Sequence, residues 1–286
     1  GTRIGRIERL GRLLHAGVDD LGSIIAQVAI SVPRLQRLDV QVFDEDAPRR
    51  DALAAQLTAA GARQVVSQRS YRRTPVLALG DSPSELFARL SPRARRSLRR
   101  FDASGRAIIA QVDDPRYVPR MQQLYRETFD RTDSDAPAVD FSDIQSDASD
   151  GRESLLAAVF WPTRQSTRDL VAVFWGRLQG DHVSYDIGAT ERADDLGQVP
   201  LGYPLMFHLA NWARDRGARW LDMGGITPPD SPPGHRLQGI ADFKRTFTTD
   251  EREVAAEFSF EPRPMLSALA DTLRGARRLL HRRHMP

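Results

Sequence analysis

The stretch that decides the fold is residues 170–187, LVAVFWGRLQGDHVSYDI. Its first part, Leu170 to Leu178, is rich in β-branched and aromatic residues, and a second such run follows from Val183 to Ile187. The short turn between them, residues 179–181, contains glycine and predicts a hairpin. A third run, Leu155 to Phe160, precedes this pair. We therefore predict an antiparallel meander of three strands.

The segment after the meander alternates between helix, strand and loop signals. A helix is predicted from Leu201 to Arg216, because apolar residues recur every three or four positions and Gly217 follows the last turn. A strand from Trp220 to Met223 and a loop rich in glycine and proline from Gly224 to Gly234 come next. Two further strands are expected, Ile240 to Phe247 and Glu253 to Phe260. Residues 155–260 should therefore form one mixed sheet flanked by helices.

The first half of the chain contains the same kinds of element. Two helices have N-cap signals, one at Ser82 and one at Ser91, and the second of these helices ends at Gly105. Residues 132–151 are rich in Asp and Ser and are expected to be a loop. The other expected elements are strands at 13–16, 37–43, 65–67, 74–79 and 107–112 and helices at 19–31, 48–60, 119–129 and 264–283.

Composition limits the class of protein. The 286 residues suffice for one large or two medium domains, and with 41% apolar and 28% charged residues the chain can bury a core. No apolar run approaches the roughly 20 residues of a membrane span, and we expect a cytoplasmic protein. The chain has no cysteine, which excludes disulfides, thiolate metal sites and cysteine nucleophiles.

The basic residues are almost all arginine. Of the 41 basic residues, Lys244 is the single lysine. A compact ammonium and a planar guanidinium are not interchangeable at a confined site. A lysine retained in such a chain therefore points to a position where arginine does not fit, although a surface lysine retained by chance gives the same pattern.

Five short motifs follow one another in the second half of the chain: YDIGAT (185–190), GYP (202–204), NWA (211–213), LDMGGI (221–226) and GIADFKRTF (239–247). In this order and spacing they resemble the Fem-type aminoacyltransferases, GNAT-superfamily enzymes that build peptidoglycan cross-bridges from aminoacyl-tRNA. The basic run from Leu90 to Arg100, followed by Gly105, is similar to the helix at the junction of that family's two domains. The resemblance covers residues 74–262.

The resemblance implies an α/β (α+β) architecture with two GNAT-like lobes. We expect a partial first lobe at residues 1–108, truncated at its N-terminus, with the C-terminal helix at 262–286 packing on it. The catalytic lobe is expected at residues 109–261. The resemblance implies a peptidoglycan precursor as the amine acceptor, and because the family's helical-hairpin insert is not recognisable, a smaller, peptide-like metabolite is the other expected acceptor.

The resemblance places the Phe-Lys pair, Phe243 and Lys244, at the reacting ester. An ammonium there would stabilise charge on the ester oxygens, and the ring would shape the channel. Asp222 and the glycines after it end a predicted strand, where open α/β folds bind ligands. Each of these residues also has a plain structural explanation, as a packed aromatic, a surface charge or a strand-end turn. The substrate-binding candidates are Tyr185, Thr190, Tyr203, Asp222, Gly224 and Gly225.

Arginines are crowded in the helix that begins at Ser91, and they lie on more than one of its faces. A positive face is what tRNA phosphates require, whereas ion pairs on a solvated helix are the alternative. The RNA-binding candidates are Arg93, Arg95, Arg96, Arg99, Arg100 and Arg245.

The donor is expected to be aminoacyl-tRNA, with no cofactor, and acetyl-CoA is the alternative donor. A CoA-dependent enzyme needs backbone amides for the pyrophosphate between the meander and the next helix, but here residues 195–204 contain two prolines. A non-catalytic RNA-binding or partner-binding module is the third possibility, and the presence of Lys244 argues against it. The six histidines have no metal-ligand spacing, so no metal is expected.

Overall fold

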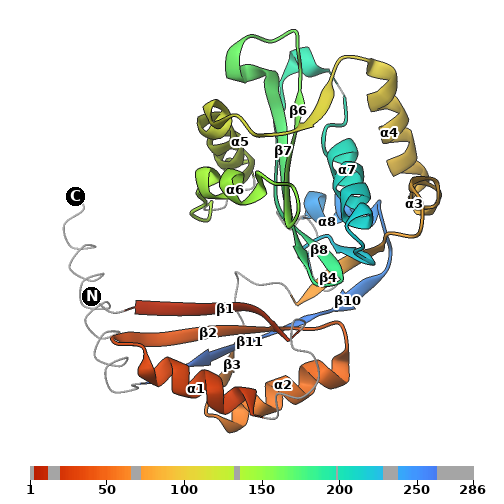
Figure 1. The fold of residues 1–286 in the computed structure, drawn as a ribbon. Helices are drawn as coiled ribbons and strands as arrows, with labels where there is room; N and C mark the ends of the chain where they lie inside the picture. Colours follow the sequence, from red (N-terminus) through yellow and green to blue (C-terminus); the bar gives the residue numbers. More distant parts are fainter. Residues whose placement is uncertain are drawn as a thin grey trace, which may run out of the picture. The chain divides into compact units, whose positions relative to one another are not determined.

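A computed structural model describes residues 3–11, 20–65, 72–131, 136–197, 199–227 and 238–262. The chain forms two compact units (Figure 1). The first unit combines Gly1–Arg72 with Glu253–Pro286, and the second unit is Arg73–Arg252. Within the described ranges, no helix is long and apolar enough to cross a membrane.

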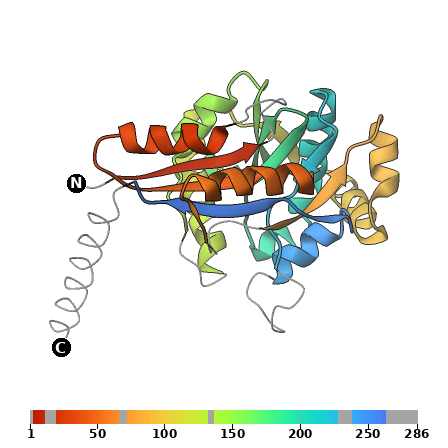
Figure 2. The same cartoon turned by 90° about the horizontal axis from the view of Figure 1, so that it is seen from below.

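The first unit is a four-stranded sheet with two helices. Its strands are ordered β1-β2-β11-β3, in which β1 and β2 are parallel and β11 is antiparallel to both of its neighbours. Helices α1 and α2 lie on the same face of this sheet (Figures 1 and 2). The elements are β1 (Arg3–Gly11), α1 (Leu21–Ser31), β2 (Leu35–Phe43), α2 (Ala47–Ala59), β3 (Arg63–Val65) and β11 (Ala255–Phe260).

The second unit is built on a seven-stranded sheet ordered β10-β4-β9-β8-β7-β6-β5. Strands β8 and β9 are parallel, whereas the pairs β4-β9, β5-β6, β6-β7 and β7-β8 are antiparallel. The predicted three-stranded meander is therefore present as β6, β7 and β8. The strands are β4 (Arg73–Ala78), β5 (Ile108–Gln111), β6 (Ser154–Phe160), β7 (Leu170–Gln179), β8 (His182–Thr190), β9 (Trp220–Asp222) and β10 (Glu251–Glu253).

Helices cover both faces of this sheet (Figure 1). One apolar core lies between the sheet and α5 and α6, and the other lies on the face of α3, α4 and α7. The expected N-caps are formed, because the Ser82 hydroxyl accepts from the Glu85 amide and the Ser91 hydroxyl accepts from the Ala94 amide. The helices are α3 (Pro83–Arg89), α4 (Pro92–Ser104), α5 (Val118–Asp130), α6 (Phe141–Ala148), α7 (Gly202–Asp215) and α8 (Gln238–Arg245).

Two expected elements are wrong. The segment expected as a loop contains helix α6, which Asp140 caps and whose buried residues Phe141, Ile144 and Ala148 recur at helical spacing. The segment expected as a strand at 240–247 is helix α8. Its buried residues Ala241 and Lys244 are three positions apart, which places them on one helical face.

The boundaries between the units also differ from those drawn on the sequence. The division expected at 108/109 falls inside the second unit, because β4, α3 and α4 pack with the second sheet. Strand β11, expected in the same sheet as the meander, pairs with β2 and β3 of the first unit. The strand expected at 13–16 and the C-terminal helix expected at 264–283 lie outside the described residues.

Candidate active site

The two parallel strands at the centre of the second sheet separate after a short pairing. The β8-β9 ladder consists of three pairs and ends at Ser184 and Asp222. Strand β8 continues to Thr190, whereas β9 ends at Asp222. Beyond this point the backbone groups that face each other across the two segments are not joined by a ladder. We call this unpaired stretch, which begins at Tyr185 on one side and Met223 on the other, the opening between β8 and β9.

A β-bulge lies at the start of this opening. On the other edge of β8, Trp175 pairs with Ile187 and Gly176 pairs with Tyr185, so Asp186 is an extra residue with no counterpart on β7. The bulge therefore lies on β8 next to the point where β9 ends. Bulges of this kind re-aim backbone groups and occur next to active sites.

The side chain of Lys244 reaches both sides of the opening. Its Nζ atom donates a hydrogen bond to the carbonyl oxygen of Gly225, at 2.7 Å, on the β9 side. The same atom lies 5.8 Å from the centre of the Tyr185 ring on the β8 side. Only 6% of the residue is exposed. The single lysine of the chain is therefore a buried cation, carried by α8 and placed next to the end of the β8-β9 pairing.

The electrostatics of this lysine follow from its burial. Burial disfavours the charged form and lowers the pKa of Lys244 to about 8, against a smaller opposing effect of the Asp222 carboxylate. Burial also raises the pKa of the Tyr185 phenol, which is neutral at physiological pH. The site therefore holds an ammonium that is weakly solvated, next to one carboxylate and one neutral phenol.

Asp222 stabilises the turn after β9, which contains Gly225, the residue whose carbonyl oxygen accepts from Lys244. Its carboxylate is fully buried and accepts hydrogen bonds from the hydroxyl of Thr74, at 2.6 Å, and from the amide of Gly224, at 2.9 Å. Gly224 has a φ of 75°, and a Cβ there would lie 3.2 Å from the lysine Nζ. The turn therefore requires glycine for its backbone and for the space beside Lys244.

Aromatic rings line the same region. The rings of Phe243, Tyr203 and Phe247 pack together, with centroids 5.0 to 5.5 Å apart. The first residue of α7, Gly202, is close enough that its Cβ would touch Phe243, at 3.4 Å. The helix that carries Lys244 is therefore anchored on the start of α7, and Phe243 and Tyr203 act in this anchor.

The ring of Tyr185 depends on a second glycine. A Cβ at Gly188 would lie 1.6 Å from the Tyr185 hydroxyl oxygen, so no other residue fits there while the ring keeps its place. Phe174 packs on the same ring at 4.8 Å between centroids. Tyr185 thus has a defined position beside Lys244.

Thr190 is not brought to this cluster. It ends β8, about 16 Å of strand beyond Tyr185, and its carbonyl oxygen accepts from Arg131 at 2.8 Å. The guanidinium of Arg245 is already engaged by two carboxylates. Its guanidinium donates to Glu251, at 2.7 Å, and lies 3.7 Å from Asp242.

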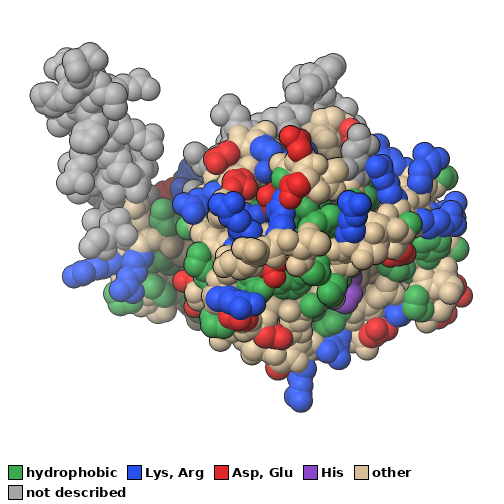
Figure 3. All heavy atoms as spheres, turned by 90° about the horizontal axis from the view of Figure 1, so that it is seen from above, with side chains coloured by type: hydrophobic (Ala, Val, Ile, Leu, Met, Phe, Trp, Pro, Cys, Tyr) green, Lys and Arg blue, Asp and Glu red, His purple; other side chains and the backbone are tan. Residues whose placement is uncertain are grey.

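The remaining RNA-binding candidates share helix α4. Arg93, Arg96, Arg99 and Arg100 are exposed, opposite the buried stripe formed by Ala94, Leu98 and Phe101. Arg95 is partly buried and donates to the Ala88 carbonyl at 2.9 Å. In Figure 3, Lys and Arg side chains gather along the right-hand edge, the side on which α4 lies in Figure 1.

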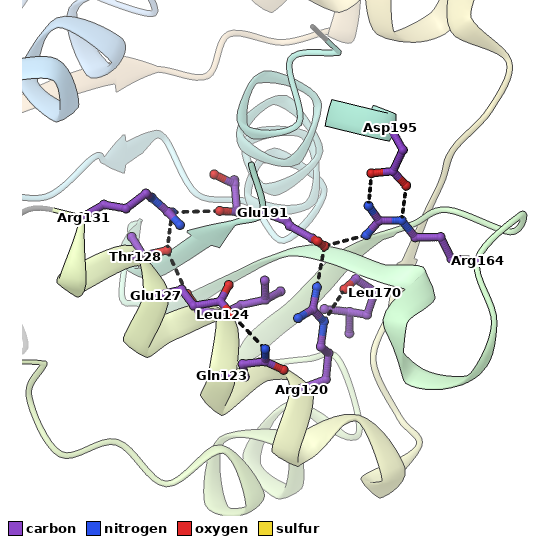
Figure 4. Close-up of polar contacts among 11 residues, drawn as sticks. Arg120, Gln123, Leu124, Glu127, Thr128, Arg131, Arg164, Leu170, Glu191 and Asp195 are labelled. Carbon is purple, nitrogen blue, oxygen red and sulfur yellow. Dashed lines mark hydrogen bonds and ion pairs between the residues drawn. The ribbon is translucent and has the colours of Figure 1, made fainter. Parts of the chain in front are cut away.

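Ion pairs that were not predicted from the sequence join the loop between β8 and α7 to Arg120 and Arg164 (Figure 4). Arg164 donates to Glu191 at 2.7 Å and forms a bidentate pair with Asp195, at 2.6 and 2.9 Å. Arg120, which is buried, also pairs with Glu191. Both arginines are thus engaged by the loop's own carboxylates. The described residues contain no cluster of three or more metal-binding side chains.

Comparisons with known proteins identify the fold. Residues 88–245 match the family model of the acetyltransferase (GNAT) domain, and because this is more than half of the chain, the protein belongs to that family. The predicted GNAT-like fold is therefore confirmed, and with it the assignment to a class of acyltransferases. No curated protein matches the chain by sequence.

Solved structures extend the likeness in fold to most of the chain. A crystal structure of FemX has a TM-score of 0.62 at 15% identity, over 82% of this chain and 74% of that one. The structure of L-PGS from Bacillus licheniformis has a TM-score of 0.51 at 15% identity, over 93% and 80%. A tandem GNAT protein from the clavulanic acid biosynthesis pathway has a TM-score of 0.53 at 15% identity, over 92% and 76%. The similarity to FemX in fold agrees with the Fem-type resemblance of the motifs.

Proposed function

We propose that this protein transfers an aminoacyl group from an aminoacyl-tRNA to an amine and that Lys244 is its catalytic cation. The observation that carries the proposal is the position of the Lys244 ammonium, buried where β8 and β9 separate. The fold supports acyl transfer in general, and the Fem-type motifs together with the fold of FemX support the aminoacyl class of donor.

The chemistry requires few groups from the protein. The acceptor nitrogen attacks the ester carbonyl carbon, the bond from that carbon to the ribose oxygen breaks, and an amide forms. One proton leaves the acceptor nitrogen and one is taken up by the ribose oxygen, through solvent or the substrate itself. Negative charge develops on the ester oxygens, and a weakly solvated ammonium stabilises it more strongly than water does. Lys244 is the ammonium in this proposal.

The features around Lys244 support an electrostatic role rather than a role as proton acceptor. At pH 7 a lysine whose pKa is lowered to about 8 is still mainly protonated. The Gly225 carbonyl satisfies one of its three N–H groups, at 2.7 Å. In this proposal the other N–H groups donate to the oxygens of the substrate.

The loop before α7 supports the choice of tRNA over CoA. A pyrophosphate at this place needs free amides and unpaired cations. Pro200 and Pro204 lack amide hydrogens, and the loop contributes the carboxylates Glu191 and Asp195, which engage Arg120 and Arg164 (Figure 4). A dianionic group would have to compete with both carboxylates.

The exposed arginines of α4 provide the complementary surface for RNA. Four of them lie on the solvent side of one helix and offer cations to phosphates without disturbing the core. The acceptor is proposed to be a primary amine, of a peptidoglycan precursor or of a smaller peptide-like compound.

The family description leaves acyl-CoA as the second candidate donor. The test is product formation with charged tRNA and with acetyl-CoA, against a panel of amines, with and without RNase. Transfer that RNase abolishes supports the proposal. Transfer from acetyl-CoA that RNase does not affect contradicts it and assigns the protein to the CoA-dependent class.

A further inference from the structure

The hydrogen bond between Thr74 and Asp222 joins two fully buried side chains that are 148 positions apart in the chain. The Thr74 hydroxyl has one proton and three acceptors in reach. Asp222 Oδ1 is at 2.6 Å, the Gly224 carbonyl at 3.1 Å and the Pro75 carbonyl at 3.3 Å. The shortest and charge-assisted contact receives the proton, so Thr74 donates to the carboxylate.

Strand β4 holds the same turn through its backbone. The Met223 amide donates to the Pro75 carbonyl at 3.2 Å, and the Ile226 amide donates to the Arg73 carbonyl at 3.4 Å. Between these two contacts the Asp222 carboxylate accepts from the Gly224 amide. The turn is therefore fixed on the side that faces β4, and its next carbonyl, that of Gly225, accepts from Lys244.

We propose that Thr74 is a positioning residue for Lys244, acting through the Asp222 carboxylate and the turn that ends at Gly225. This proposal rests on the proposed function at one point, which is the role of Lys244 in acyl transfer. Thr74 does not touch the substrate. Its hydroxyl orients the carboxylate, the carboxylate orients the turn, and the turn fixes the ammonium. A displacement of about 1 Å at a reacting centre costs on the order of 100-fold in rate.

The first test compares variants at Thr74. Thr74→Val keeps the shape and removes the hydroxyl, whereas Thr74→Ser keeps the hydroxyl. The matched control is Thr248→Val, which removes a hydroxyl that donates to the Val76 carbonyl, at 3.0 Å, and accepts from the Asp250 amide, at 3.1 Å. We expect Thr74→Val to lower the single-turnover rate by roughly 10-fold to 100-fold, with Thr74→Ser and Thr248→Val within a few-fold of the wild type. A Thr74→Val variant as active as Thr248→Val would overturn the proposal.

The second test does not depend on the donor. Because Lys244 is the only lysine, protein labelled with ¹³C at lysine Cε has a single lysine signal. We expect the signal and its titration midpoint to move in Thr74→Val, with a lower pKa because the carboxylate is less well held, and to stay in place in Thr74→Ser and Thr248→Val. An unchanged signal in Thr74→Val overturns the proposal even where the rate falls, since the loss is then not one of lysine position.

These two readouts separate this proposal from the proposed function. If wild-type protein transfers nothing from either donor, the proposed function fails, while the lysine signal still decides the role of Thr74. If Thr74→Val does not fold, Thr74→Cys replaces it. Its thiol is a weak donor, so a shift in the same direction but smaller is expected, and no shift overturns the proposal.

Discussion

The Nζ atom of Lys244 lies 2.7 Å from the carbonyl oxygen of Gly225, at the point where two parallel strands separate. This hydrogen bond brings helix α8 and the turn after β9 to one place. An ammonium has three donors and a guanidinium five, so beside this one carbonyl a buried lysine leaves fewer donors without an acceptor than a buried arginine would.

The pKa of Lys244 is the first prediction. It should be close to 8, measured from the ¹³C signal of the labelled protein as a function of pH. In the unfolded chain the pKa returns to the ordinary value near 10.4. At pH values between these two pKa values the unfolded state binds more protons than the folded state. The free energy of unfolding should therefore rise with pH over this range, by roughly 3 kcal/mol in total.

The matched control for this titration is Lys244→Met. It removes the titrating group but keeps an unbranched side chain in the same space. The difference in unfolding free energy between the two proteins should change with pH from about 8 to about 10.4, because only the wild type has the titrating ammonium. A difference that stays constant over this range contradicts a lowered pKa for Lys244.

Gly188→Ala should destabilise the second unit. The added methyl group would overlap the Tyr185 hydroxyl, whose oxygen lies 1.6 Å from the Cβ position. Overpacking of this kind costs about 1 to 3 kcal/mol, measured by denaturant unfolding. Gly239→Ala on α8 is the control, because a Cβ there meets no atom within 4 Å and alanine favours a helix. If the two variants are equally stable, the Tyr185 ring moves aside without a loss of stability, and the prediction is contradicted.

Neutralising the exposed arginines of α4 should weaken tRNA binding. The triple variant Arg93→Gln, Arg96→Gln, Arg100→Gln leaves the buried stripe of the helix intact. A plot of log affinity against log salt concentration has a negative slope. We expect this slope to become less steep by about one for each phosphate that an arginine no longer neutralises. Arg126→Gln, on the exposed side of α5, is the control. A triple variant with the affinity and slope of the control would remove α4 from the RNA surface.

CoA should bind weakly or not at all. Calorimetric titration with CoA is expected to show no micromolar site, because Pro200 and Pro204 remove amides from the loop and from the first turn of α7, and the loop's carboxylates already pair with Arg120 and Arg164. Charged tRNA titrated under the same conditions should bind. A micromolar CoA site together with no binding of tRNA would reverse the assignment of the donor.

Much of the second sheet is predictable from local sequence, because the meander strands are long, apolar and separated by a glycine turn. The prediction of a strand in place of helix α8 was wrong for a physical reason. Ile240, Phe243 and Phe247 recur at spacings of three and four residues, which is the pattern of a helix and not of a strand, and the buried residues Ala241 and Lys244 are also three positions apart.

The candidate site was predictable only in part. Lys244, Tyr185, Asp222 and Gly224, which the motifs singled out, lie together in the structure. Thr74 was missed because nothing near it in sequence marks it, and its partner Asp222 is 148 positions away. The ion pairs of Arg164 were missed for the same reason, since arginines and carboxylates are abundant and their pairing depends on the fold. Long-range polar contacts carry no local periodicity.

The most direct test of the proposed role of Lys244 is single-turnover transfer from an aminoacyl-tRNA to an amine by wild-type protein, Lys244→Arg and Lys244→Ala. Arg245→Lys is the control, because it keeps a cation one position further along the same helix. We predict that both Lys244 variants stay folded by circular dichroism and lose roughly 100-fold to 1000-fold in rate, while Arg245→Lys loses far less. A fully active Lys244→Arg variant would contradict this role.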